Sequence, residues 1–264
     1  MGDVTPVLVL AGVLGLLVGS FLNVVIWRVP RGESVVSPPS ACPACEHRIR
    51  PWDNVPVVSW LALRGRCRDC GAAISARYVL VESATGVLFV LTVVRFGVAW
   101  ETLAFGYLAA VGLALALIDL DVHRLPDALV LPSYPVVGVV LVIASLAPGG
   151  TTGPGALLRG LVGAVGLFTL YFALMVLRPG GMGFGDVKLA GVLGGALAWL
   201  GWGSWVVGAF AAFLLGGIFS LGLLVSRRAG RRSAIPFGPW MVLGAAVGAA
   251  WGEALWGAYL GVLA

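Results

Sequence analysis

Eight long apolar segments, separated by short polar stretches, dominate the pattern of the chain. A helix needs roughly 20 apolar residues to cross the hydrocarbon core of a bilayer, so the pattern predicts an all-α polytopic membrane protein with about eight transmembrane helices. The sixth segment has only about fifteen residues, and we expect it to be short, tilted or partly re-entrant. The segments are roughly 5–27, 78–98, 101–119, 128–147, 155–177, 186–200, 202–226 and 238–262.

The composition supports this class and excludes a soluble domain with a single anchor. Hydrophobic residues make up 59% of the 264 residues and charged residues only 11%, whereas soluble domains carry about 25% charged residues. The mean hydropathy is +1.00, and the 39 glycines suit helices that pack through small residues in lipid. The first segment lacks a basic stretch before it and a cleavage site after it, so we expect a retained span.

The arginines predict the orientation of the chain. The 17 basic residues, 16 of them arginine, against 12 acidic residues give the net charge of +5. Most of the arginines lie in loops, which is typical of membrane orientation and not of a nucleic-acid-binding face. Alternate loops carry them, and the loops near 99–100, 148–154 and 201 carry none. We therefore expect the basic loops in the cytoplasm and both termini outside. The loop arginines are Arg28, Arg31, Arg48, Arg50, Arg64, Arg66, Arg68, Arg77, Arg124, Arg178, Arg227, Arg228, Arg231 and Arg232.

The first basic loop contains all four cysteines, arranged as two Cys-X-X-Cys pairs with 21 residues between them. This spacing is close to the range of about 15–20 residues that is typical of zinc ribbons. Four thiolates suit tetrahedral Zn²⁺, and a cytoplasmic loop disfavours disulfides. We expect a small zinc-ribbon-like domain stabilised by a structural Zn²⁺; free thiols or a redox pair are the alternative. The metal ligands would be Cys42, Cys45, Cys67 and Cys70.

Two aspartates at span ends are candidates for catalysis. Asp119 ends the third span, and Asp186 follows Gly183-Phe184-Gly185 at the start of the sixth. The chain crosses the membrane twice between them, so both are expected on the same face, where a charge is costly and usually functional. Two adjacent carboxyls share a proton, so that one activates water while the other polarises a carbonyl, as in an aspartic protease. The glycines allow a close approach to the partner aspartate or to a substrate backbone.

Other roles are open for the polar residues around this pair. Asp186 alone is also suited to cap the sixth span, and Asp127 is expected to be the N-cap of the fourth. Asp121 is expected to be a solvated loop residue close enough to tune the site, and His123 a loop residue and not a ligand. Lys188 is expected either to pair with a carboxylate or to extend to the membrane interface.

Five segments in order resemble the bacterial type 4 prepilin peptidases, which are both leader peptidases and N-methyltransferases. The resemblance covers nearly the whole chain. The matching segments are Gly19–Pro30, the two cysteine pairs, Ile118–Asp127, Gly183–Lys188 and Ile235–Pro239.

The resemblance implies that the protein cuts the basic leader from prepilins or pseudopilins, after a glycine, at the cytoplasmic face of the inner membrane. By motif, Asp119 and Asp186 would be the catalytic pair. It also implies N-methylation of the new N-terminal residue with S-adenosylmethionine. The organisation is then a first transmembrane helix at 1–27, a Cys₄ loop tied to methyl transfer at 28–77, and a seven-helix peptidase domain at 78–264.

The residues that bind the methyl donor stay unassigned, because no glycine-rich turn of the soluble methyltransferase kind occurs. Asn23 and Arg28, near the inner end of the first span, and Glu33 and Glu82, in or near the loop, are candidates, with packing roles as the alternative. Three other functions stay open: a peptidase without methyl transfer, a proton-coupled transporter, and a zinc-bearing scaffold of a pilus or secretion machine. The transporter is disfavoured because, apart from Glu82 and Arg159 near span ends, we find no ionisable residue near the middle of a span and no inverted repeat.

Overall fold

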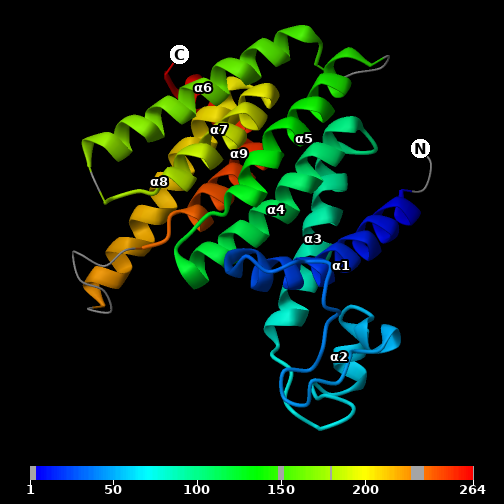
Figure 1. Ribbon diagram of the computed structural model, residues 1–264. Helices are drawn as coiled ribbons and strands as arrows, with labels where there is room; N and C mark the ends of the chain where they lie inside the picture. The colour runs from blue at the N-terminus through cyan, green and yellow to red at the C-terminus, as the bar shows by residue number, and fades with distance from the viewer. Residues whose placement is uncertain (1–3, 148–151, 179, 227–234, 264) are drawn as a thin grey trace. The chain divides into compact units, whose positions relative to one another are not determined.

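The computed structural model describes residues 4–147, 152–178, 180–226 and 235–263, and within these ranges it is almost entirely helical (Figure 1). Two isolated β-bridges occur in the cysteine loop. The elements are α1 (Thr5–Arg28), η1 (Val29–Arg31), η2 (Pro51–Asn54), α2 (Val58–Ala62), α3 (Arg77–Phe96), α4 (Trp100–Val122), α5 (Asp127–Leu146), α6 (Pro154–Leu177), α7 (Phe184–Leu200), α8 (Trp202–Val225) and α9 (Gly238–Leu263).

All eight long helices coincide with the apolar segments of the sequence, which confirms the all-α polytopic prediction. Within the described ranges, seven of them are long and apolar enough to cross a membrane. The eighth, α7, has 17 residues and is about 25 Å long at 1.5 Å per residue, which is less than the roughly 30 Å of the hydrocarbon core. The expectation of a short sixth segment is therefore confirmed. Arg227, Arg228, Arg231 and Arg232 lie outside the described residues.

The chain divides into two compact units, and helix α4 contributes to both. Unit 1 comprises residues of 1–98 and 105–114, and unit 2 comprises 99–104 and residues of 115–264. In unit 1, α1 and α3 pack side by side. A Cβ at Gly15 would lie 2.7 Å from the backbone of Gly86, and one at Gly19 would lie 2.7 Å from Glu82 Cα. Small residues thus let the two helices approach closely, as is usual in lipid.

Helix α7 is the centre of unit 2. It packs against α5, α6, α8 and α9, and twelve of its 17 residues are buried. Its C-terminal carbonyls are capped by Arg159 of α6, which donates to Ala198 O, Trp199 O (2.6 Å) and Leu200 O (3.3 Å). A cation at a helix C-terminus is stabilised by the helix dipole. This contact fixes the far end of the helix whose first turn carries Asp186.

We predict that Gly194→Ala destabilises unit 2. The added Cβ would lie 2.6 Å from Gly163 O and 2.9 Å from Leu167 Cβ, and overpacking of this kind costs about 1–3 kcal/mol. The midpoint of thermal unfolding in detergent should therefore fall. Gly138→Ala is the matched control, because a Cβ there meets nothing within 4 Å. An unchanged midpoint for Gly194→Ala would contradict the close packing of α6 on α7.

Candidate active site and cysteine cluster

Asp119 lies in the last turn of α4 and is buried, with 5% of its surface exposed. Its Oδ2 atom accepts a hydrogen bond of 2.9 Å from the backbone N–H of Gly238, the first residue of α9. A Cβ at position 238 would lie 2.9 Å from this same oxygen. A glycine at the start of α9 is therefore what allows the backbone to reach the carboxylate.

Asp186 lies in the first turn of α7 and is also buried. Its Oδ2 atom accepts a hydrogen bond of 3.0 Å from the N–H of Gly183, in the manner of the third helical residue of a capping box. Its Oδ1 atom is buried and has no hydrogen-bond partner. The capping role anticipated for Asp186 is thus present, but it occupies only one of the two oxygens.

The structure brings the two aspartates together at one end of unit 2, close enough for their charges to interact. Leu125, in the turn after α4, lies between the segments that carry them. A Cβ at Gly185 would lie 2.9 Å from Leu125 Cβ, and one at Gly238 would lie 3.1 Å from Leu125 Cδ2. Gly185 therefore makes room for the chain that follows Asp119.

An ion pair joins the N-terminal ends of α7 and α5. Lys188 Nζ lies 2.7 Å from Asp127 Oδ1 and 2.8 Å from Oδ2, so the carboxylate alternative for Lys188 is confirmed. Asp127 is the first residue of α5 and makes no capping hydrogen bond; Pro126 is the N-cap. The N-cap prediction for Asp127 is therefore wrong, because its carboxylate turns to the lysine of α7.

The other two polar residues of this segment lie at the end of α4. Asp121 is exposed in its last turn, which continues two residues beyond the expected end of the span at Asp119. His123 is the C-cap in a left-handed conformation, and its N–H donates to Asp119 O at 2.9 Å. The loop position expected for His123 is confirmed, whereas Asp121 is helical.

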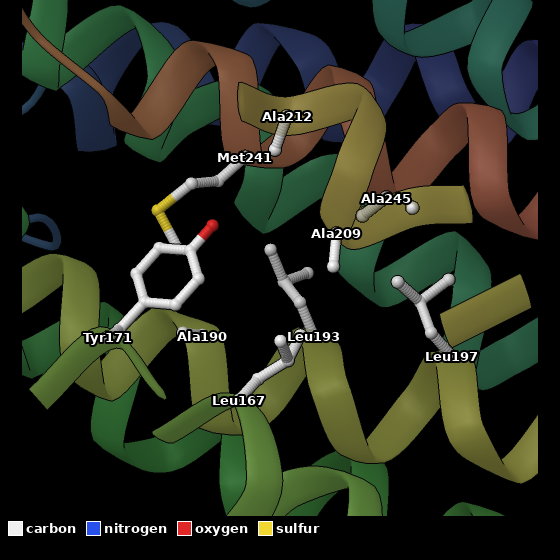
Figure 2. A pocket seen from close by; sticks show the side chains of 10 residues that line it. Leu167, Tyr171, Ala190, Leu193, Leu197, Ala209, Ala212, Met241 and Ala245 are labelled. Atoms are coloured by element: carbon white, nitrogen blue, oxygen red, sulfur yellow. The ribbon is translucent and has the colours of Figure 1, made fainter. Parts of the chain in front are cut away.

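A small cavity lies among α6, α7, α8 and α9 (Figure 2). Tyr171 of α6 is 2% exposed, interacts electrostatically with Asp186, and points toward Met241 of α9 in this view. The cavity measures about 10 Å³, which is near the lower limit for one water molecule. It cannot hold a peptide, and neither Asp119 nor Asp186 lines it.

The four cysteines lie in two turns of matching geometry. In the first, Cys42 N–H donates to His47 O and Glu46 N–H donates to Cys42 O; in the second, Cys67 N–H donates to Ala72 O and Gly71 N–H to Cys67 O. Glu46 and Gly71 occupy equivalent positions and both have a positive φ, 59° for Glu46 and 72° for Gly71. The two turns hold their thiols toward a common point. All four Sγ atoms lie within 4.8 Å of one another.

Two ion pairs brace these turns. Arg68 of the second turn contacts Asp53 at 2.6 Å, and Arg50 contacts Asp69 at 2.8 Å. The Arg68 guanidinium holds the pKa of Asp53 below its usual range. In the first turn, the backbone N–H groups of Ala44 and Cys45 lower the pKa of Cys42 to about 7, whereas burial and the neighbouring thiols raise the pKa of Cys45 to about 12.

The candidate residues for methyl transfer have different surroundings in unit 1. Asn23 donates to Tyr78 O at 3.1 Å, and Arg28 donates to Ser34 O at 2.9 Å and to Pro38 O at 2.7 Å. Glu82 is buried and accepts hydrogen bonds from the Val57 N–H at 2.7 Å and from Ser20. Glu33 is exposed.

Sequence reasoning did not find the parts played by Leu125, Tyr171 and Gly238 at the aspartates. Gly238 and Leu125 lie within the Ile235–Pro239 and Ile118–Asp127 segments, and the match of these segments to the resembled family was the only signal for them. Tyr171 lies in an apolar span outside those segments, and nothing in its local sequence separates it from an ordinary packing residue.

Comparison with known proteins gives a family for this arrangement. Residues 13–96 match the "Bacterial Peptidase A24 N-terminal domain" and residues 106–221 match the "Type IV leader peptidase family". Relatives named "Prepilin leader peptidase/N-methyltransferase" occur in Stutzerimonas stutzeri (37% identity over 94% of this chain and 92% of the relative), Pseudomonas aeruginosa (37%, 94% and 91%) and Neisseria gonorrhoeae (39%, 87% and 85%). No solved structure matches the chain.

The fold and its apolar helices define a multi-pass membrane protein. The chain belongs to the type IV leader peptidase family, and its relatives carry the name of an enzyme with both peptidase and N-methyltransferase activity. It is therefore a membrane enzyme of this family, as the five sequence segments indicated.

Proposed function

We propose that the protein cleaves the basic leader from type IV prepilins or pseudopilins and then N-methylates the new N-terminal residue. One observation carries the cleavage proposal: two buried aspartates from distant motifs lie close enough for their charges to interact, and an oxygen of one of them, Asp186 Oδ1, has no hydrogen-bond partner. A buried carboxylate oxygen without a partner is costly, and such groups gather at functional sites. The names of the relatives supply the substrate class.

In the proposed reaction, the two carboxyls share one proton, because two charges so close cannot both form cheaply. We assign the proton to Asp186 Oδ1, since that atom lacks a donor, and the ionised state to Asp119, which accepts the Gly238 N–H. Asp119 takes a proton from the attacking water, and protonated Asp186 polarises the scissile carbonyl. Water adds to the carbonyl carbon, and when the tetrahedral intermediate breaks down Asp119 gives its proton to the amide nitrogen, which leaves as the new N-terminal amine, while Asp186 takes its proton back from the hydroxyl that becomes the new carboxyl group.

The location suits a substrate with an apolar helix behind a basic leader. The helix can lie in lipid while the leader stays in water, so that the scissile bond falls at the membrane boundary. Asp119 and Asp186 are at span ends. The arginine-rich loops support a cytoplasmic face of the inner membrane for this site, with both termini on the opposite side.

We also propose that the cysteine cluster binds one structural Zn²⁺. Zn–S bonds of about 2.3 Å in a tetrahedron require sulfur atoms about 3.8 Å apart, and Cys42 Sγ and Cys70 Sγ are 3.8 Å apart. Cys42, Cys45, Cys67 and Cys70 would fill all four positions, so the ion would stabilise the loop without taking part in catalysis. For methyl transfer, S-adenosylmethionine is the proposed donor, and the peptidase supplies the acceptor amine.

Asp119→Asn and Asp186→Asn should each abolish cleavage of a co-expressed prepilin while the protein stays in the membrane. Asparagine keeps the shape but cannot exchange the shared proton, and such general acid–base groups contribute about 10²–10⁴-fold in rate. Cleavage is measured as the mobility shift of the pilin and confirmed by mass spectrometry. Glu33→Gln, at an exposed position in unit 1, is the control and should cleave normally. Normal processing by either dyad mutant would refute the carboxylate pair.

Metal analysis of purified protein should find about one zinc per chain, held by four thiolates. Replacing Cys42 and Cys67 together with serine should remove it and lower the midpoint of thermal unfolding, because the loop has little apolar core of its own. Wild-type protein that contains no zinc after purification without chelators would overturn the metal site.

A processed pilin should carry one methyl group on its N-terminal amine when the wild-type enzyme is supplied with S-adenosylmethionine. Mass spectrometry of the pilin N-terminus reports the cleavage position and the methyl group in one measurement. Complete cleavage with no added methyl group would restrict the function to a peptidase.

A further inference from the structure

Unit 1 contains a cavity that the peptidase chemistry does not use. It measures about 320 Å³, which is at the lower end of the range of about 300–1,000 Å³ for small-molecule pockets. One wall is the second half of α1, and the other is the proline-rich start of the cysteine loop together with η2. Polar groups from all three segments line it, namely Ser20, Arg28, Ser40 and Asn54.

Arg28 gives this cavity a definite charge preference. Two backbone carbonyls, Ser34 O and Pro38 O, hold its guanidinium in place, and these partners are neutral. No carboxylate pairs with Arg28 in the described part of the chain, and none lines the cavity. A fixed guanidinium with free N–H groups and no acidic partner is suited to bind a carboxylate or phosphate of a ligand.

Hydrogen bonds to the buried Glu82 carboxylate hold the cavity wall in place. Glu82 of α3 accepts the N–H of Val57, next to the lining residue Pro56, and the hydroxyl of the lining residue Ser20. This carboxylate therefore ties the loop to α1 and α3. On the other side, the lining residues Leu17 and Phe21 are 55% and 52% exposed, so the cavity borders the surface of α1 that would face lipid. A pilin helix lying in the bilayer could present its amine there.

We propose that this cavity binds S-adenosylmethionine, with the Arg28 guanidinium holding its carboxylate and Asn54 contacting its nucleoside. The inference rests on the methyl transfer proposed above. The peptidase family model covers residues 106–221, which leaves the second activity in the relatives' name to residues outside that match. Residues 13–96, which match the N-terminal domain, contain this cavity with its unpaired cation. The flat ring of Phe21 offers an apolar contact for the adenine.

The test measures binding of two probes to purified full-length protein by calorimetry. S-adenosylhomocysteine has the amino-acid end of the donor, and 5′-methylthioadenosine has the same nucleoside and thioether without it. Wild-type protein should prefer the first probe by roughly tenfold or more, the value of hydrogen bonds to a charged group. Arg28→Gln should remove most of this preference and leave 5′-methylthioadenosine binding unchanged. Arg31→Gln is the control, because Arg31 stacks on Trp27 and lies outside the cavity.

A folded Arg28→Gln variant that keeps the preference would overturn the proposal, as would an equal loss for both probes. If that variant elutes as an aggregate, Asn54→Ala decides: the proposal requires weaker binding of both probes, and unchanged binding overturns it. Phospholipid retained by wild-type protein in native mass spectrometry and lost in Arg28→Gln, with S-adenosylhomocysteine binding unchanged, would assign the cavity to a lipid. If the wild-type protein methylates a processed pilin and the Arg28→Gln and Asn54→Ala variants bind S-adenosylhomocysteine as well as it does, the cavity assignment alone is refuted. If the wild-type protein neither binds S-adenosylhomocysteine nor methylates, the proposed methyl transfer is refuted.

Discussion

The contact of Leu125 with Gly185 and Gly238 is the constraint on which the candidate active site depends. Three chain segments meet at this one side chain: the turn after α4, the first turn of α7 and the start of α9. Any side chain at 185 or 238 would displace Leu125 or a carboxylate. The spacing of Asp119 and Asp186 is therefore set by backbone packing, which is far stiffer than contacts between flexible side chains.

Helix α7 is held at both ends by contacts inside unit 2, which also fixes the position of its first turn. Asp186 at its start accepts the Gly183 N–H, and Arg159 caps the carbonyls at its end. Glu253 lies well inside α9, so the expectation that no further ionisable residue lies near the middle of a span is wrong; its carboxylate accepts the N–H of Ser204 at the start of α8. Both ends of a short, buried helix are thus held by charged groups. These contacts hold α7 in place along its axis, and they therefore also fix the position of Asp186, the proposed catalytic carboxylate in its first turn.

The sequence predicted the helices well because lipid requires long apolar segments, and their lengths are visible directly. It also predicted that Asp119 and Asp186 lie at one end, since two crossings return the chain to the same side. It could not predict the partner of Asp127, because the choice between capping its own helix and pairing with Lys188 depends on tertiary distance. The contacts of Leu125, Gly238 and Tyr171 near the aspartates also depend on tertiary distance, so the sequence could not predict them either.

Hydrogen-bond satisfaction separates the proposed reactive carboxylate from the structural ones. Glu82 accepts from Val57 and Ser20, Glu253 from Ser204, and Asp119 from Gly238. Among the buried carboxylate oxygens of the described residues, Asp186 Oδ1 alone lacks a partner. A satisfied carboxylate stabilises its surroundings, whereas an unsatisfied one stores a cost that a proton, a water or a substrate can relieve. Burial and charge alone would have ranked Glu82 beside Asp186; the missing partner distinguishes them.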